Sequence, residues 1–396
     1  MDASVTPRPA PTRARPFEKT QGRTPLWLRL WLGRDLAPSR EEFQAALDGL
    51  WVGDPAMDEL VAWMEEYGRG RGHKLFQQAL SQGVDSLTEA PEPLVRFFRG
   101  VETRPDWVDA ALLAQGARFI HGTGEGATFV LRDLALMGGY LLSGFNQSLV
   151  LTGALTEGTG RRVARTGHWW IDCTEVGGLE PLAAGYRATL QVRLVHALVR
   201  RDLDRREDWD HERWGLPLSQ VDMVATYLGF SVVMLNGLRL LGIPVTPGES
   251  RAVMHLWRYA CWLMGVQEPW LVDTEKEGAL RLHHTLMTQS QPDWTTPELA
   301  RALAREPLAH RFPRLQGVRR RLRYHMHLST SRYFLGKEKM RQLGLPDHIL
   351  PWFPLLTIVP RFTYYSSHRF LPGLRERLQQ RGRAFQKAAV GTLRES

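Results

Sequence analysis

Apolar positions along this chain recur with the period of an α-helix, and none of its segments alternates strictly as a β-strand does. The clearest example is the stretch 161–200, RRVARTGHWWIDCTEVGGLEPLAAGYRATLQVRLVHALVR, in which two helical pieces flank a Gly-rich turn. The first piece carries Arg162, Arg165 and Thr166 within little more than one helical turn. These three polar side chains therefore share one face of a helix predicted for residues 161–171.

The second piece begins after Pro181 and Gly185 and is apolar on nearly every side, which is typical of a buried helix. His196 lies in the middle of this run, with Arg193 and Arg200 near it at helical spacing. A neutral imidazole can give one ring nitrogen to a metal while the other donates a hydrogen bond elsewhere. His196 is therefore a candidate metal ligand. The alternative is a core histidine whose ring is satisfied by a carbonyl group.

The same periodicity predicts helices along the rest of the chain. Ser39 followed by Glu42 fits a capping box, which opens a helix that runs to Leu50. We find no strand pattern, hairpin turn or internal repeat, so the sequence predicts an all-α fold. Further helices are predicted for residues 57–67, 74–80 and 249–264, which are amphipathic, for 106–120, for 220–241, which is buried, and for 374–390, which is amphipathic and basic.

Residues 134–156 form the longest stretch without a charge, LALMGGYLLSGFNQSLVLTGALT. Its length matches a membrane span of about 20 residues. Four glycines, together with Asn146 and Gln147, make it a poor span. We therefore predict buried helices that are interrupted near Gly144.

Composition narrows the kinds of site that the chain can hold. It has 396 residues, enough for a large core, and only two cysteines, Cys173 and Cys261. A disulfide framework and any multi-cysteine zinc or iron–sulfur site are therefore excluded. The 14 tryptophans suit a large apolar cavity or cofactor pocket, and they equally suit a Trp-rich helical core.

The net charge of +9 is unevenly distributed. Residues 1–40 carry +5 and residues 311–396 carry +14, which leaves −10 on the middle of the chain. This pattern argues against a nucleic-acid-binding domain and favours cationic ends that pack on an acidic body or meet an anionic membrane surface. The N-terminus has no apolar run of the kind found in secretory signals. We therefore expect a cytoplasmic protein, with peripheral membrane contact through the basic termini as an open alternative.

Five segments, in order, resemble one family of proteins. It is the MpaB / rubber-oxygenase family, which includes the bacterial latex clearing proteins, and the resemblance covers roughly residues 95–345. No single motif is diagnostic, and it is the order of all five that carries the resemblance. The segments are TGAL from Thr152, RRVARTGHWW from Arg161, RLVHALVR from Arg193, GLPLSQVDMVATYLGFS from Gly215 and HLWRYACWLMGV from His255.

The resemblance implies an all-α, globin-like helical bundle that encloses a haem b pocket. Members of the family cleave carbon–carbon double bonds of isoprenoid chains with dioxygen as co-substrate. By this resemblance His196 is the proximal iron ligand, and Arg162, Arg165 and Thr166 lie on the distal side, where we assign them to catalysis. The two arginines would stabilise bound oxygen or anchor a propionate, and the threonine would donate or relay a hydrogen bond.

Arg193 and Arg258 are assigned to cofactor binding. Arg258 could pair with a haem propionate, and a structural salt bridge is the equal alternative. A non-haem iron site would instead need two histidines and a carboxylate that converge. Only tertiary structure could bring the other candidate histidines to His196, namely His121, His168 and His255.

Two departures from the family pattern bear on the reaction. Latex clearing proteins carry a lysine, able to occupy the sixth position on iron, where Arg165 stands, and an arginine is always charged and does not readily coordinate. Those enzymes also use a distal carboxylate, whereas residues 143–149 hold Asn146 and Gln147 and no acid. Both departures put polyisoprene cleavage in doubt. The nearest glutamates in the sequence are Glu125 and Glu157.

We therefore predict a haem b-dependent oxygenase that cleaves a double bond in an isoprenoid or other hydrophobic substrate, with no nucleic-acid partner and with the redox partner left open. The alternatives are a peroxidase-like or tailoring oxidation of a small terpenoid or polyketide, and a non-enzymatic, lipid-binding helical protein. The predicted organisation is a disordered basic segment (1–25), an N-terminal helical extension (26–94), the haem-binding oxygenase domain (95–345) and a basic C-terminal helical extension (346–396).

Overall fold

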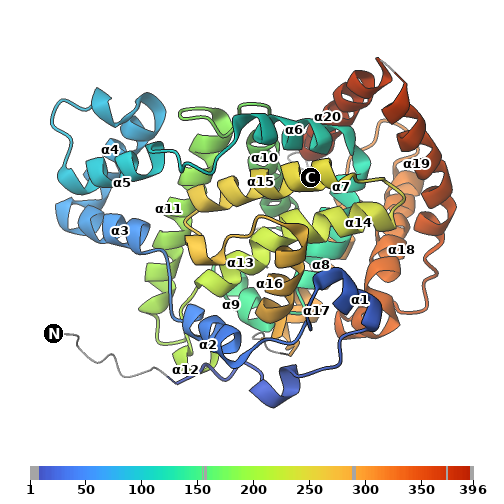
Figure 1. Cartoon of the computed structure of the whole chain (residues 1–396), viewed down its shortest axis with the longest axis horizontal. Coiled ribbons are helices and arrows are strands. Elements are labelled where there is room, and N and C mark those ends of the chain that lie inside the picture. Colours follow the sequence, from blue (N-terminus) through green and yellow to red (C-terminus); the bar gives the residue numbers. More distant parts are fainter. Residues whose placement is uncertain (1–8, 154, 156–157, 288–290, 372, 393–396) are drawn as a thin grey trace.

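The computed structural model describes residues 9–153, 155, 158–287, 291–371 and 373–392, and every regular element in these ranges is a helix. The predicted all-α fold is confirmed (Figure 1). Short 3-10 turns lie at Phe17–Thr20, Val84–Ser86, Glu268–Trp270 and Glu306–Ala309, and π-helical turns η3 and η4 lie at Leu131–Leu136 and Gly229–Val233. The α-helices are α1 (Leu26–Leu32), α2 (Arg40–Gly49), α3 (Pro55–Tyr67), α4 (Arg69–Gln82), α5 (Glu92–Glu102), α6 (Ala110–Gly122), α7 (Glu125–Val130), α8 (Met137–Gly139), α9 (Ser143–Leu151), α10 (Thr159–Cys173), α11 (Ala184–Asp204), α12 (His211–Trp214), α13 (Gln220–Leu228), α14 (Met234–Leu240), α15 (Pro247–Leu263), α16 (Glu275–Met287), α17 (Thr295–Arg305), α18 (Gln316–Gln342), α19 (Trp352–Phe370) and α20 (Leu374–Thr392).

The rod formed by α13, η4 and α14 is the predicted buried helix. A capping box starts it, because Ser219 and Asp222 exchange hydrogen bonds between side chain and backbone. Among the described residues it is the single continuous helix, Gln220–Leu240, with the length and composition to cross a membrane, and 61% of its apolar window is buried in the protein. That degree of burial is what a core helix of a globular protein shows.

The uncharged stretch 134–156 is broken, as predicted. The chain bends by 96° between the helical segment Glu125–Gly139 and α9, so that no straight helix runs through it. The break lies at residues 140–142, immediately before Gly144. Within α9, Ser143, Gly144, Asn146 and Ser148 are buried, which places the polar side chains of this segment inside the protein.

Helices α6 and α15 lie unusually close together. A Cβ atom added to Gly116 of α6 would come within 2.5 Å of the backbone oxygen of Ala252 in α15. Glycine therefore lets the two backbones touch, and α15 buries Trp257, His255 and Tyr259 as a result. The predicted amphipathic helix 249–264 is in fact buried on most sides.

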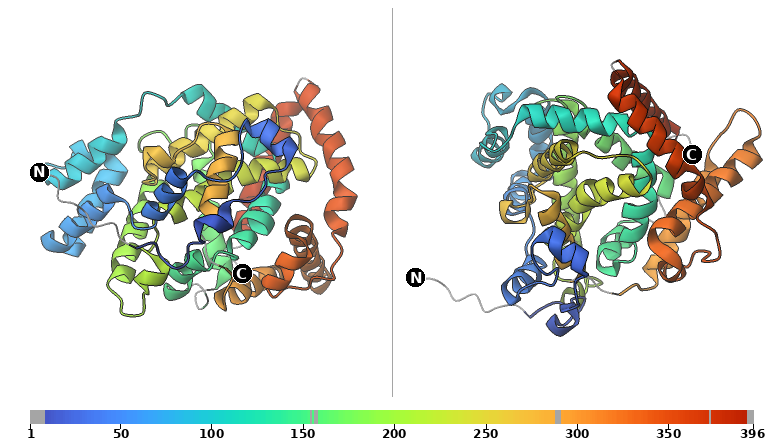
Figure 2. Two further views of the ribbon diagram at one scale, coloured as in Figure 1. Left: turned by 60° about the horizontal axis from the view of Figure 1, so that its bottom comes forward. Right: turned by 45° about the vertical axis from the view of Figure 1, so that its right-hand side comes forward.

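Part of the segment 1–25, which is predicted to be disordered, is ordered in the structure, and residues 1–8 of it lie outside the described residues. Residues 9–25 run along the body of the protein, in front of it in the left view of Figure 2. The backbone N–H groups of Thr12 and Arg13 donate to the carbonyl oxygens of Glu212 and Arg213 at 2.8 and 3.0 Å. The Arg13 side chain is buried and forms a 2.7 Å ion pair with Asp222. Because this contact joins residues 209 positions apart, local composition gave no sign of it.

The C-terminal helices α18, α19 and α20 form the right-hand end of the molecule in Figure 1, where they pack on one another. The predicted basic amphipathic helix is α20, and it packs on the body. Its Gln386 donates to the Ile120 carbonyl at 2.9 Å, and its Arg383 donates to the Thr174 hydroxyl at 3.0 Å. Arg383 also pairs with Glu175 at 3.2 Å, so that part of the positive charge of this end is neutralised by the acidic body.

The close approach of α6 and α15 leads to a stability prediction. Replacing Gly116 by Ala should force the two helices apart and lower the free energy of unfolding by about 1–3 kcal/mol. Gly100 of α5 is a matched control, because a Cβ atom there would meet nothing within 4 Å. Gly100→Ala should be neutral or stabilise by up to about 1 kcal/mol, since alanine is the better helix former. Urea unfolding followed by circular dichroism measures both, and equal effects of the two variants would contradict the prediction.

Candidate functional site

His196 lies in α11 with its ring deep in the protein and with some accessible surface left. Such a side chain borders space that the protein atoms do not fill. Its Nδ1 is buried and has no hydrogen-bond partner among the described residues. Burial lowers the pKa of His196 to about 4, and the positive charge of Arg200 adds to this effect, while Asp54 opposes it. The imidazole is therefore neutral at pH 7, which is the form that coordinates a metal.

Helices α10 and α11 run antiparallel, and their contacts fix which residues lie at the same level. The Thr189 hydroxyl accepts a hydrogen bond from the Trp169 indole N–H at 3.0 Å and lies 3.2 Å from the Cys173 sulfur. His196 follows Thr189 by seven residues, which is two helical turns, so the two side chains share an edge of α11. Arg162, Arg165 and Thr166 lie in the first half of α10, before Trp169.

The three residues predicted to lie on the distal side share this half of α10. Arg162 donates a short hydrogen bond to the Tyr140 hydroxyl, while its Nε is buried and has no partner among the described residues. Arg165 and Thr166 are exposed, and the Thr166 hydroxyl donates to the Arg162 carbonyl at 3.3 Å. The structure thus groups Arg162, Arg165 and Thr166 as expected. Their catalytic role stays a prediction.

A cluster of stacked aromatic rings lies beside this region and was not anticipated from the sequence. The Phe230 ring stacks on Trp257 with centroids 4.9 Å apart, and Trp169 of α10 packs against both rings at 5.3 and 5.6 Å. Trp257 is completely buried, whereas Trp169 and Phe230 keep accessible surface. These two aromatic side chains therefore border open space. Trp169 does so next to the edge of α11 that carries Thr189 and His196. The only signal in the sequence was the high tryptophan content.

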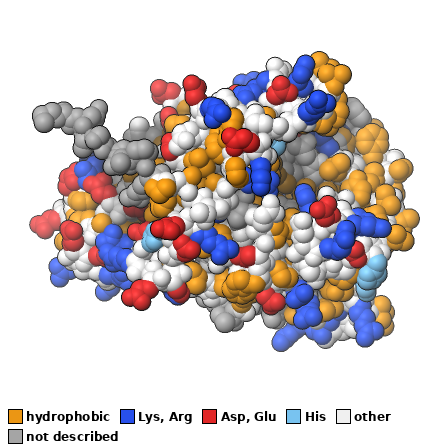
Figure 3. Space-filling model, turned by 90° about the horizontal axis from the view of Figure 1, so that it is seen from below, with side chains coloured by type: hydrophobic (Ala, Val, Ile, Leu, Met, Phe, Trp, Pro, Cys, Tyr) orange, Lys and Arg blue, Asp and Glu red, His pale blue; other side chains and the backbone are white. Residues whose placement is uncertain are grey.

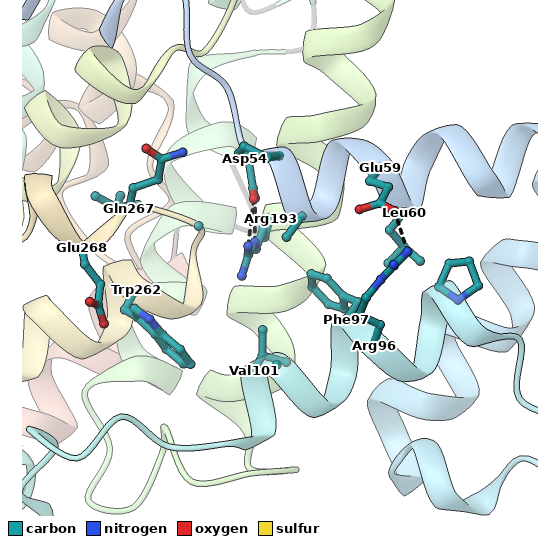
Figure 4. A pocket seen from close by; sticks show the side chains of 16 residues that line it. Asp54, Glu59, Leu60, Arg96, Phe97, Val101, Arg193, Trp262, Gln267 and Glu268 are labelled. Carbon is teal, nitrogen blue, oxygen red and sulfur yellow. Dashed lines mark hydrogen bonds and ion pairs between the residues drawn. The ribbon is translucent and has the colours of Figure 1, made fainter. Parts of the chain in front are cut away.

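Arg193 holds α11 against α3. Its guanidinium group donates to both carboxylate oxygens of Asp54, at 2.6 and 2.8 Å, and to the Leu263 carbonyl at 3.1 Å. It also lies over the Phe97 ring at 5.1 Å. Figure 4 shows this ion pair on the wall of a pocket of about 390 Å³, with Glu59 and Arg96 paired across it. Protein groups thus surround Arg193, and its assignment to cofactor binding remains a prediction.

Arg258 has protein partners as well. It pairs with Asp273 at 2.8 Å and lies over the Trp107 ring at 4.0 Å. Of the two alternatives for this residue, the structural salt bridge is the one seen, and pairing with a haem propionate stays a prediction. The neighbouring His255 accepts a hydrogen bond from the Asp109 backbone N–H at 2.9 Å.

A non-haem metal site finds no support in the described part of the chain. No group of three or more His, Cys, Asp or Glu side chains there could hold a metal ion. His121 bonds to the Thr174 carbonyl at 2.7 Å, and His255 is engaged at the start of α6. The assignment of His196 as an iron ligand stays a prediction.

The position expected to carry the family's distal acid is occupied by a structural amide. The Asn146 side-chain NH₂ group donates to the Tyr140 carbonyl at 2.9 Å and to the Thr295 hydroxyl at 3.1 Å. Gln147 donates to Asp293 at 2.9 Å, so an acid does contact α9, from a loop 146 residues further along the chain. Sequence proximity could not reveal Asp293. Of the glutamates nearest in sequence, Glu125 pairs with Arg323 at 2.7 Å, and Glu157 lies outside the described residues.

The fold and this site define an all-α protein with a neutral, deeply placed histidine on α11 and a cluster of stacked aromatic rings that bonds to the same helix through Trp169 and Thr189. Residues 126–362 match the family described as ER-bound oxygenase mpaB/B′ and rubber oxygenase, catalytic domain. The match spans more than half of the chain, which therefore belongs to this family of oxygenases. The resemblance expected for residues 95–345 is confirmed, with both ends of the match further along the chain.

The fold is also similar to a solved structure, that of latex clearing protein LCP in the closed state. The TM-score is 0.61, the alignment covers 86% of this chain and 91% of that chain, and 18% of the aligned residues are identical. At this identity the likeness shows the fold alone. None of the curated proteins matches the sequence.

The buried ion pair between Arg193 and Asp54 can be tested by mutation. Asp54→Ala should leave the Arg193 guanidinium group buried without its partner and remove the cap of α3, which lowers the free energy of unfolding by about 3–5 kcal/mol. The exposed pair of Arg206 and Asp208 is the control, and Asp208→Ala should leave the unfolding midpoint almost unchanged. Urea unfolding compares the two variants. An Asp54→Ala midpoint close to that of the control would show that the pair contributes little.

Proposed function

We propose that this protein is a haem b-dependent oxygenase that uses dioxygen to cleave a carbon–carbon double bond in an isoprenoid or similar hydrophobic substrate. The observation that carries the proposal is His196, whose neutral ring sits deep in a protein of an oxygenase family with one nitrogen lacking a hydrogen-bond partner among the described residues.

The residues present fit a haem group. A proximal histidine must be neutral and must keep a ring nitrogen free for iron, and His196 meets both conditions. The exposed edges of Trp169 and Phe230 offer apolar surface to a flat macrocycle. The buried Nε–H of Arg162 lacks a partner in the described structure. It could donate a hydrogen bond to a haem carboxylate or to another polar acceptor.

When bound, the haem iron supplies the chemistry that activates dioxygen for addition to the double bond. The chain supplies position and environment. His196 would hold the cofactor from α11, and Arg162 of α10 would offer its buried Nε–H to a polar group of the ligand. The Thr166 hydroxyl already donates to the Arg162 carbonyl, so it would act as an acceptor. Arg165 stays charged and would not compete as a metal ligand. The aromatic cluster would offer apolar surface to the substrate, which disfavours water there.

A second candidate function is favoured by Asn146. An amide cannot accept a proton at pH 7, and the NH₂ group of Asn146 is already bonded to Tyr140 and Thr295. A reaction that needs a carboxylate base at this position would therefore be slow. A peroxidase-like or tailoring oxidation of a small terpenoid or polyketide, which leaves the carbon skeleton intact, does not need that base.

The haem assignment is tested by His196→Ala. The wild-type protein, expressed with a haem precursor, should show a Soret band, and the variant should lose it because its proximal ligand is gone. His73 is exposed on α4, and His73→Ala should keep the band in full. The measurement is the ratio of Soret to protein absorbance, together with pyridine haemochrome analysis. Full haem content in His196→Ala would overturn the assignment of this residue.

The type of reaction is tested by product analysis. We expect wild-type protein incubated with squalene and air to release fragments with paired aldehyde and ketone ends and to consume one dioxygen per cleaved bond. A hydroxylated or dehydrogenated product with the full carbon count would instead favour the second candidate function. His196→Ala, assayed at equal protein concentration, is the negative control.

A further inference from the structure

The outer face of α19 is apolar and exposed. It consists of Leu355, Leu356, Val359 and Phe362, whose exposed fractions are 59%, 69%, 70% and 55%. Their spacing of three to four residues sets them along one side of the helix. Leu350 before the helix and Leu371 after it are 73% and 52% exposed, so that apolar side chains are offered along a length of about 28 Å.

The one charged side chain of this segment points inward. Arg361 is the only Asp, Glu, Lys or Arg between residues 351 and 368. Its guanidinium carbon lies 5.7 Å from the ring centroid of the buried Phe129 and 5.2 Å from that of Phe353. A helix on the surface of a globular protein normally faces the core with its apolar side and water with its charges. Helix α19 has apolar side chains on its core side, where Phe353 and Tyr365 pack, and on its outer side as well, which indicates that its outer side meets a medium other than water.

The surroundings of this face are positively charged. Residues 311–396 carry a net charge of +14. Helices α18 and α20, which both pack on α19, expose arginines, namely Arg319, Arg321, Arg375, Arg377 and Arg381. Figure 3, seen from below, shows hydrophobic side chains mixed with Lys and Arg at the right-hand end, where α18 and α19 lie in Figure 1.

We propose that α19 is a membrane-docking helix, which lies in the plane of an anionic lipid surface with Leu355, Leu356, Val359 and Phe362 inserted at the boundary between headgroups and acyl chains. An exposed apolar stripe flanked by arginines is what such a surface binds, since acyl chains take up the apolar side chains and lipid phosphates attract the guanidinium groups. The proposal does not rest on the reaction that the protein performs.

Charge also distinguishes between two possible binding partners of this apolar face, a lipid surface and a second copy of this chain. Self-association through α19 would bring two strongly cationic ends together, and their repulsion would oppose the contact. An anionic surface neutralises the same arginines. The membrane is therefore the occupant that matches both the apolar and the charged features of this end of the protein.

The test is flotation of the full-length protein with phosphatidylcholine vesicles that contain phosphatidylserine, compared with vesicles of phosphatidylcholine alone. The wild type should float with the anionic vesicles, and binding should weaken at high salt. Leu356→Glu combined with Val359→Glu should lower the affinity about tenfold or more, because carboxylates replace the inserting side chains. Arg319→Gln combined with Arg321→Gln should lower it about fivefold per charge on anionic vesicles only.

The control is Tyr67→Glu on α3, an exposed aromatic residue at the opposite end of the molecule in Figure 1, which should bind as the wild type does. A second readout uses Val359→Cys, which can be labelled selectively because Cys173 and Cys261 are buried. An environment-sensitive dye at this position should shift to the blue with anionic vesicles. No flotation of the wild type, no dye shift, or a dimer in solution that the α19 substitutions dissociate would each overturn the proposal.

Discussion

The pairing of α11 with α3 through buried arginines is the interaction on which the rest of the site depends. The side chains of Arg193 and Arg200 project from the buried side of α11. They bond to Asp54, the N-cap of α3, and to Asp58 in its first turn. A buried guanidinium group is tolerable only when such partners surround it. Since His196 lies between these two arginines in the sequence, the ion pairs fix the rotation of α11 and thereby the direction of the imidazole ring.

This arrangement also explains why His196 is neutral. The ring lies within one turn of a permanent positive charge, Arg200, and deep in the protein, and both conditions disfavour a second proton. The helix that carries the histidine thus places most of its charge on residues that have carboxylate partners. Burial and the charge of Arg200 are therefore enough to keep the imidazole of His196 uncharged.

Much of the helix pattern could be predicted from the sequence, because capping boxes and apolar periodicity are local. Ser39 and Glu42 form the predicted box, and the buried rod 220–240 follows from its composition. The grouping of Arg162, Arg165 and Thr166 is likewise local, since it requires only one helical turn. The resemblance to the family, rather than any spacing, is what singled out His196 among 13 histidines.

What the sequence could not provide are the contacts between distant residues. The carboxylate partners of Arg193 and Arg258 lie 139 and 15 residues away, and Asp293 reaches α9 from 146 residues further on. The polar, proline-rich composition of residues 1–25 predicts disorder, whereas the described residues 9–25 are ordered by contacts with distant parts of the chain. The exposed apolar side of α19 was hidden for the same reason, since which side faces the core is a property of the assembled fold.

The ion pair between Arg13 and Asp222 has a consequence for the order in which the chain folds. Its two partners are separated by 209 positions, so residues 9–15 cannot reach their final place until the chain has been made as far as α13. Closing a loop of this size is entropically costly and slow, which makes docking of residues 9–15 a late step. Until residues 9–15 dock, the carboxylate of Asp222, which also takes part in the capping box of α13, lacks its Arg13 partner and is exposed to water. Docking of this segment then covers the start of the buried helix α13.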